Sequence, residues 1–186
     1  NLQFLEFLVL PLVLLHLFVQ HLQELQRLED AVASYGRAIA IQPDYAEARW
    51  NQSLALLQLG DFQAGWALYE SRWACAASAG ARRNFVAPLW LGHGSLVNKT
   101  LLLHAEQGFG DAIQFCRYAQ SVKDAGARVL LEVPGALMGL LAQLPGVDQL
   151  IERGTILPSF DYHCPLMSLP LAFGTTVATI PFPRPN

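Results

Sequence analysis

Residues 99–118 constrain the fold of this chain more than any other stretch. Three consecutive leucines, residues 101–103, form the kind of apolar run that a buried β-strand needs. Gly108 and Gly110 follow in a short turn, and apolar side chains then recur at helical spacing over residues 112–124. This order of strand, glycine-rich turn and helix opens the sheets of many α/β enzymes. It predicts polar side chains and backbone N–H groups at the carboxyl end of a strand, where such folds bind ligands.

The rest of the C-terminal half repeats this alternation of strand and helix. Apolar runs predict further strands, and amphipathic stretches of about ten residues between them predict crossover helices, so the sheet is expected to be parallel. Strands are predicted at residues 100–104, 128–133 and 149–151, a short strand or turn at 160–163, and helices at 112–124 and 135–143.

The N-terminal half has a different period. Tyr35 and Tyr69 lie 34 residues apart. Around Tyr35, small residues would let two helices approach, the tyrosine would fill the gap between them, and a proline would end the helix. The small residues are Ala31 and Ala38, and the proline is Pro43. This spacing resembles the second helix of a tetratricopeptide repeat.

The resemblance to tetratricopeptide repeats covers residues 12–79. It implies helices at 12–25, 28–41, 46–59 and 62–75, the last with Asp61 as its N-cap. The second repeat departs from the pattern, because Gly65 stands where alanine is usual and Arg72 replaces a second small residue. We therefore expect a terminal repeat that packs on something else, since about three repeats are normally needed for a stable core.

Composition excludes several classes of function. Hydrophobic residues make up 53% of the chain and charged residues 15%, which argues against disorder. The net charge of −3 comes with only one adjacent basic pair, Arg82-Arg83, so no face for nucleic acid is indicated. The three cysteines, at positions 75, 116 and 164, form no CxxC motif and no complete set of pairs, which favours a reduced, cytoplasmic setting.

Residues 7–19 are almost wholly apolar, but a membrane-spanning helix needs about 20 such residues. A buried helix is the favoured interpretation, with a membrane or interfacial segment and a non-native sequence as alternatives. No positive region and no small-residue cleavage site accompany the run, so a signal peptide is not predicted. The chain begins with Asn rather than Met and is expected to be a fragment.

The candidate site loop contains Gln107, Gly108, Gly110 and Asp111. Glycines permit positive φ and close backbone approach to a ligand, and a following helix presents N–H groups to an anion. The full dinucleotide fingerprint and the P-loop motif are both missing, and no cofactor is indicated. A plain alternative is a tight turn in which Asp111 caps the helix.

Three stretches together carry a second resemblance. They are LLLHAEQGFGDAIQFCRYA, ARVLLEVPGALMGLLAQLPGVDQLI and FDYHCPLMSLPLAFGT, within residues 99–180. They resemble the acceptor-side half of bacterial tetratricopeptide-linked glycosyltransferases, which are similar to heptosyltransferases and to O-linked N-acetylglucosamine transferases. The resemblance implies a GT-B architecture of two facing Rossmann-like domains, with Asp111 as the general base.

Sugar transfer to a hydroxyl needs a group that takes the acceptor proton. His104 is the other candidate base, because its ordinary pKa suits neutral pH, although it is equally read as a wall residue. His163 is expected to line the same cleft. Adjacent His163 and Cys164 have no standard zinc spacing, so no metal site is predicted.

The sequence thus predicts helical repeats over residues 1–79, a connector over 80–98 and a Rossmann-like half-transferase over 99–186. A nucleotide-sugar donor would bind only with a second domain, so the isolated chain is expected to lack turnover. The repeats would hold a protein or peptide. The alternative is a non-catalytic scaffold that binds proteins through its tetratricopeptide repeats.

Overall fold

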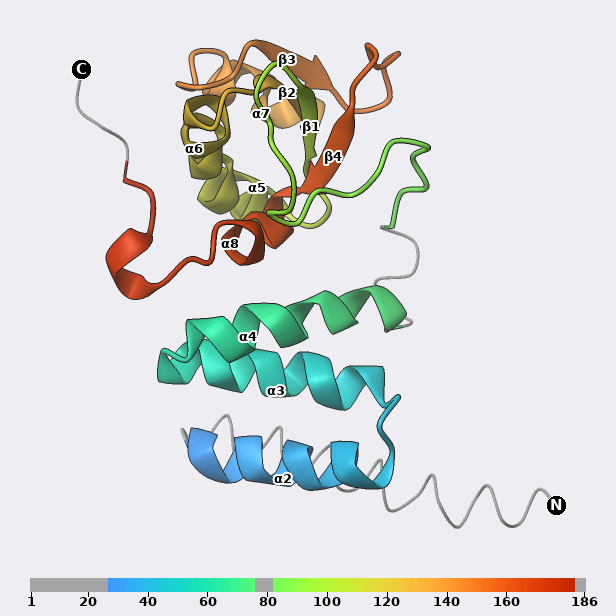
Figure 1. The fold of residues 1–186 in the computed structure, drawn as a ribbon, viewed down its shortest axis with the longest axis vertical. Coiled ribbons are helices and arrows are strands. Elements are labelled where there is room, and N and C mark those ends of the chain that lie inside the picture. The colour runs from blue at the N-terminus through green and yellow to red at the C-terminus, as the bar shows by residue number, and fades with distance from the viewer. Residues whose placement is uncertain (1–26, 76–81, 183–186) are drawn as a thin grey trace, which may run out of the picture. The chain divides into compact units, whose positions relative to one another are not determined.

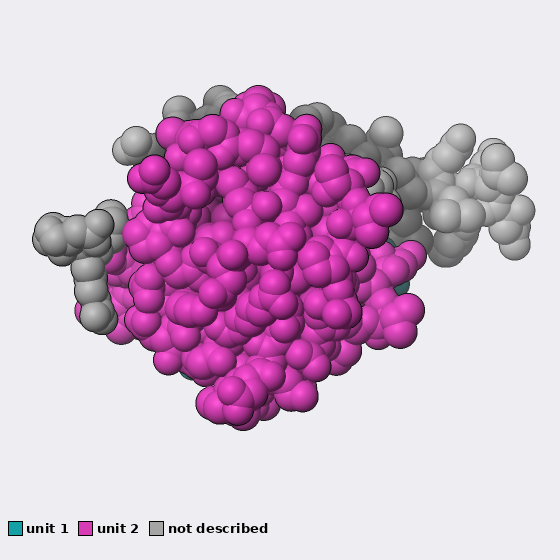
Figure 2. Space-filling view, turned by 90° about the horizontal axis from the view of Figure 1, so that it is seen from above, with its two compact units in different colours: residues 1–80 teal, residues 81–186 magenta. Residues whose placement is uncertain are grey.

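The computed structural model describes residues 27–75 and 82–182. Contacts divide the chain into two compact units, Asn1–Gly80 and Ala81–Asn186, which are coloured separately in Figure 2.

The described part of the first unit, residues 27–75, is helical (Figure 1). Its described helices are α2 (Leu28–Ile41), α3 (Ala46–Leu59) and α4 (Phe62–Tyr69), and α4 continues into a 3-10 helix, η1 (Glu70–Ala74). The helices predicted at 28–41 and 46–59 are confirmed, and the one predicted at 62–75 is α-helical to Tyr69 and a 3-10 helix from there to Ala74. The predicted helix 12–25 and the apolar run 7–19 lie outside the described residues. Helix α3 packs against both α2 and α4.

The residues that carry the repeat pattern form the contact between α2 and α3. Tyr35 is 2% exposed and clusters with Ala31, Ala38 and Ala48. The Gln52 side chain of α3 donates a hydrogen bond to the Val32 carbonyl of α2 at 3.0 Å. Small residues between the helices therefore allow the close approach that the sequence predicts.

The start of α4 and its continuation show how the second repeat is stabilised. Asp61 caps α4 as predicted, because its carboxylate accepts a hydrogen bond from the Ala64 N–H at 3.1 Å. Arg72 is fully buried in place of a small residue. Its guanidinium is 2.6 Å from a Glu70 carboxylate oxygen and lies 4.3 Å from the centre of the Trp73 ring, so burial of this charge is compensated locally.

The second unit contains a four-stranded parallel sheet in the order β3-β2-β1-β4. The strands are β1 (Thr100–His104), β2 (Arg128–Val133), β3 (Gln149–Glu152) and β4 (Tyr162–Pro165). In the register, Leu102 of β1 stands opposite Leu130 of β2 and His163 of β4. The predicted fold class, helical repeats followed by a Rossmann-like α/β unit with a parallel sheet, is confirmed, and β4 begins two residues later than the predicted 160–163.

Short helices connect and follow the strands. They are α5 (Phe109–Phe115), η3 (Cys116–Tyr118), α6 (Ala119–Asp124), α7 (Gly135–Leu141), η4 (Leu166–Ser168), α8 (Leu169–Ala172) and η5 (Val177–Thr179).

The helix predicted to begin at Ala112 begins at Phe109. Gly108, in extended backbone, is its N-cap, and the Gly108 carbonyl accepts the Ala112 N–H at 3.2 Å. The alternative in which Asp111 caps the helix is therefore wrong, and Asp111 lies in the first turn of α5.

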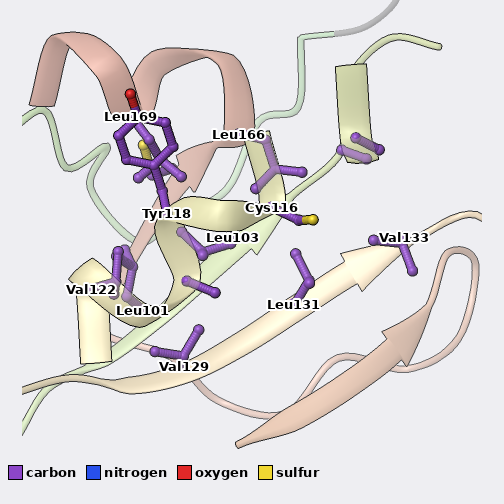
Figure 3. Packing of buried hydrophobic residues seen from close by; sticks show 14 of the residues in the cluster. Leu101, Leu103, Cys116, Tyr118, Val122, Val129, Leu131, Val133, Leu166 and Leu169 are labelled. Atoms are coloured by element: carbon purple, nitrogen blue, oxygen red, sulfur yellow. The ribbon is translucent and has the colours of Figure 1, made fainter. Parts of the chain in front are cut away.

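The two faces of the sheet are covered differently. Leu101 and Leu103 of β1 belong to a large core with Cys116 and Leu169, which come from the helical segments (Figure 3). Leu137 of α7 belongs to the same core. Because side chains alternate along a strand, the neighbouring Leu102 and His104 point to the opposite face. A smaller cluster there joins Leu102 to the core residues Leu130 and Ile151 and to the partly buried Phe85, Leu157 and Phe160, none of which lies in a helix.

Residues before β1 belong to the same unit. Trp90 and Leu96 are 6% and 3% exposed and lie in the larger core. Leu89 forms a single parallel bridge with His163 of β4. The Trp90 N–H donates to the His163 carbonyl at 2.9 Å, and the His163 N–H donates to the Pro88 carbonyl at 3.1 Å, which ties this segment to the outer edge of the sheet.

Candidate functional site

The loop after β1 is open to solvent. Gly108 and Gly110 are both exposed, and Phe109 between them is 53% exposed. Neither glycine has a positive φ, and a Cβ on Gly110 would meet nothing within 4 Å. The glycines are therefore not required by local backbone strain or packing. Because these glycines have no side chains, the backbone of the turn between β1 and α5 is accessible to solvent. Gln107, which precedes the turn, is partly exposed.

Asp111 points back toward this loop. A Cβ on Gly108 would stand 3.8 Å from the Asp111 Oδ2 atom. Asp111 is partly exposed, and within the described residues no hydrogen bond to its carboxylate is found. A carboxylate that a helix holds in place, and that accepts no hydrogen bond from a neighbouring residue, can accept a proton from a bound hydroxyl group.

His104 and His163 form a buried pair on the other face of the sheet. The His104 Nε2 and His163 Nδ1 atoms are 3.2 Å apart, and the side chains come from the adjacent strands β1 and β4. His104 is 1% exposed and His163 is 9% exposed. Burial, followed by the nearby positive charge of Arg83, lowers the pKa of His163 from its ordinary value, so the neutral imidazole is favoured.

The structure thus groups the predicted site residues into two sets. Asp111 belongs to a helix whose Ala112 packs into the core formed by Leu101 and Leu103. His104 and His163 belong to the opposite face, where the Phe85 ring lies over both, with ring centres 5.5 Å and 4.8 Å away. Helix α5, which carries Asp111, and the histidine pair therefore lie on opposite faces of the sheet.

Sequence reasoning missed the residues that surround the histidine pair. Glu132 of β2 is fully buried and forms an ion pair with Arg83, whose side chain is 34% exposed. One oxygen of that carboxylate, Oε1, accepts no hydrogen bond from the described residues. The guanidinium of Arg83 also lies 4.5 Å from the centre of the Phe85 ring. The available signal was a glutamate at a buried position of an apolar strand, because such a charge requires a partner.

A second missed residue touches the loop after β1 directly. The Arg153 side chain, which follows β3, donates a hydrogen bond to the Ala105 carbonyl. The Ala105 N–H in turn donates to the Glu132 carbonyl at 3.0 Å. Hydrogen bonds to Glu132 of β2 and to Arg153, which follows β3, therefore fix Ala105, the first residue of the loop.

A hollow in the second unit lies away from these residues. It has a volume of about 490 Å³ and is formed by α5, α6 and the segments near Leu144 and Phe182. None of the predicted site residues lines it. Within residues 27–75 and 82–182, no cluster of three potential metal ligands is found. In the same ranges, no helix combines the length and apolar character needed to cross a membrane.

Comparisons with known proteins find a family similarity in the N-terminal part of the chain. A family model described as TPR repeat matches residues 22–60. Protein FlbA of Caulobacter vibrioides is 33% identical over 82 residues, which are 44% of this chain and 14% of FlbA. The match therefore spans about one seventh of that protein. No solved structure was found to match the chain.

Proposed function

We propose that the helical unit binds a protein or peptide partner. The observation that carries this proposal is the TPR repeat match over residues 22–60, which contains the packed helix pair α2 and α3. Stacked helical repeats of this kind create extended surfaces that suit polypeptide ligands.

A displayed random-peptide library tests this proposal with the full chain as bait. We expect selected peptides to lose binding with Trp50→Ala in α3 and to keep it with Leu140→Ser, which alters a side chain that is 64% exposed on α7. Trp50 is chosen because it is large, aromatic and only partly exposed, as binding hot spots are. Peptides that depend on Leu140 instead, or no enrichment at all, would contradict the proposal.

A second candidate function is sugar transfer from a nucleotide-sugar donor to a hydroxyl acceptor. The specific observation in its favour is the strand order β3-β2-β1-β4. Such an order has its topological switch between β1 and β4, and open parallel sheets bind ligands beyond the carboxyl ends of the strands at that point. The exposed loop with Gln107, Gly108 and Gly110 follows β1 there.

In this second function, residues 99–186 form the acceptor-side half of the transferase, after a repeat region over 1–79 and a connector over 80–98. Asp111 takes the proton of the acceptor hydroxyl while the donor's phosphate group leaves. Gly108 and Gly110 leave room for the acceptor, and the side-chain amide of Gln107 forms hydrogen bonds with it. His104 and His163 can contribute only when Phe85 moves, because both are buried.

The test uses the complete protein that contains this chain, supplied with nucleotide-sugar donors. Asp111→Asn should remove most transfer to protein acceptors without lowering the melting temperature, whereas Asp124→Asn on α6 should have no effect. Equal transfer by the Asp111→Asn and Asp124→Asn proteins would exclude Asp111 as the base, and the peptide-binding proposal would stand unaffected.

A further inference from the structure

Residues 82–87 cross the non-helical face of the sheet with few attachments. This segment has no helix or strand, Val86 within it is fully exposed, and Arg82 and Asn84 are also exposed. The backbone hydrogen bonds of this part of the described chain begin at Pro88, which accepts from the His163 N–H. Segments with few buried contacts and few backbone hydrogen bonds open at low free-energy cost.

Two side chains attach the segment to the sheet. Phe85 contacts His104, His163 and Phe160, the last at a ring-centre distance of 5.3 Å. Arg83 forms the ion pair with Glu132. The attachment therefore combines an aromatic cover with one electrostatic contact.

The ion pair decides whether the cover is stable. Glu132 is fully buried while the segment lies over it, and Arg83 provides its counter-charge. A buried carboxylate without a counter-charge is strongly unfavourable, whereas water satisfies it once the segment moves away. The second carboxylate oxygen, Oε1, already lacks a hydrogen bond within the described residues. Closure is therefore coupled to the charge on Arg83.

We propose that residues 83–85 form a lid that controls access to the His104–His163 pair and that the Arg83–Glu132 ion pair holds this lid closed. When the lid is closed, Phe85 shields both imidazoles from solvent. When it opens, Glu132 becomes hydrated and both imidazoles become accessible to a ligand at this face. The lid lies within the second unit, and its opening does not depend on sugar transfer.

Carbethoxylation of histidine by diethyl pyrocarbonate, mapped by mass spectrometry on the full chain, measures this access. The reagent attacks neutral imidazole nitrogens that solvent reaches, and His93, which is exposed, serves as the internal reference. In the unaltered protein, His104 and His163 should react much more slowly than His93.

Variants of the ion pair separate the lid from a merely structural contact. Arg83→Met removes the guanidinium that lies over the Phe85 ring and leaves Glu132 without its counter-charge, so modification of His163 should accelerate by about tenfold or more. Arg82→Met, at the exposed neighbouring arginine, should leave the rate unchanged. The double variant Arg83→Met/Glu132→Leu should restore protection, because no buried charge then demands water.

Circular dichroism identifies any variant that unfolds, and Phe85→Leu, which opens the cover without altering charge, replaces Arg83→Met in that case. Unchanged protection in a folded Arg83→Met protein would overturn the proposal. Equal modification of all histidines in the unaltered protein would overturn it as well. Accelerated modification that the double variant does not reverse would show that Glu132 is not what holds the lid.

Discussion

Gly65 in α4 lies so close to Leu57 in α3 that a Cβ on Gly65 would stand 2.7 Å from the Leu57 Cδ2 atom. The glycine replaces the alanine that is usual in the repeat pattern, and the reason is steric. The Leu57 side chain of α3 fills the space where a Cβ atom on residue 65 would lie. A residue with a Cβ atom at this position would therefore not allow α3 and α4 to approach so closely.

The first prediction concerns this contact. Gly65→Ala should destabilise the helical unit by about 1 kcal/mol, because overpacking costs about 1–3 kcal/mol and the gain in helix propensity recovers about 1 kcal/mol. Gly36→Ala in α2 is the matched control, since its Cβ would lie 3.5 Å from Gln52 Nε2, an ordinary contact. That variant should gain about 0.5–1 kcal/mol. Thermal unfolding followed by circular dichroism distinguishes them, and equal shifts would contradict the steric explanation.

The second prediction compares two glycines with the same backbone conformation. Gly146 and Gly154 have φ values of 84° and 93°. A Cβ on Gly146 would stand 2.5 Å from the Gln120 Cα atom in α6, whereas a Cβ on Gly154 would meet nothing within 4 Å. Both alanine variants incur the left-handed strain of about 1–2 kcal/mol. Gly146→Ala should cost about 2 kcal/mol more in denaturant unfolding, because backbone atoms cannot move aside. Similar losses would show that α6 adjusts freely.

The third prediction concerns a buried pair of hydroxyl groups. The Tyr118 Oη and Thr175 Oγ1 atoms are 2.8 Å apart, and both residues are buried. Tyr118→Phe or Thr175→Val alone should each cost about 1–3 kcal/mol of unfolding free energy, because one buried hydroxyl loses its partner. The double variant should cost less than the sum of the two. A double-variant cycle in urea measures this coupling, and strict additivity would mean that the hydroxyl groups do not depend on each other.

The fourth prediction is a pH dependence. A hydrogen bond from Lys123, 2.6 Å from Asp148 Oδ1, is the main cause that lowers the pKa of Asp148. The Val129 N–H donates to the other oxygen at 2.8 Å. A lowered carboxyl pKa means that the contribution to stability is present above the ordinary value of 3.8 and is lost as pH falls through the lowered value.

Asp148→Asn should therefore lower the free energy of unfolding at neutral pH by about 1 kcal/mol, which also lowers the melting temperature. The melting temperature of the variant should depend less on pH below about 5 than that of the unaltered protein. Lys123→Met serves as the companion variant and should flatten the acid limb in the same way. Parallel acid limbs for the variant and the unaltered protein would rule out this ionic contribution.

Local patterns made much of the fold predictable. The helices at 28–41 and 46–59 can be predicted from the repeat spacing. Ala31 and Tyr35 pack against the next helix, and this helix-to-helix contact recurs in every repeat of the pattern. The strands β1 and β2 follow from their apolar runs, because strands covered on both faces need no polar alternation. The sequence predicts the start of α5 at Ala112 and not at Phe109, because Gly108 and Gly110 favour a loop; a glycine disfavours a helix interior by about 1 kcal/mol without excluding it.

The candidate site was less predictable, because its surroundings depend on long-range contacts. Arg83 and Glu132 are 49 residues apart, and Arg83 lies in a stretch without hydrophobic periodicity. Nothing local indicates that Phe85 covers the sheet. The pairing of His104 with His163 likewise required the register of β1 with β4, which a single sequence does not specify.

The short bridge between Leu89 and His163 also affects how this protein associates with others. β4 is the outermost strand on its side of the described sheet, and unpaired edge strands invite strand addition and aggregation. The Pro88 carbonyl and the Trp90 N–H already occupy the His163 backbone groups on that edge, while Trp90 is anchored in the core. A foreign strand would have to displace Trp90 from the core before it could pair there, so residues 88–90 protect this edge of the described sheet from pairing with another chain.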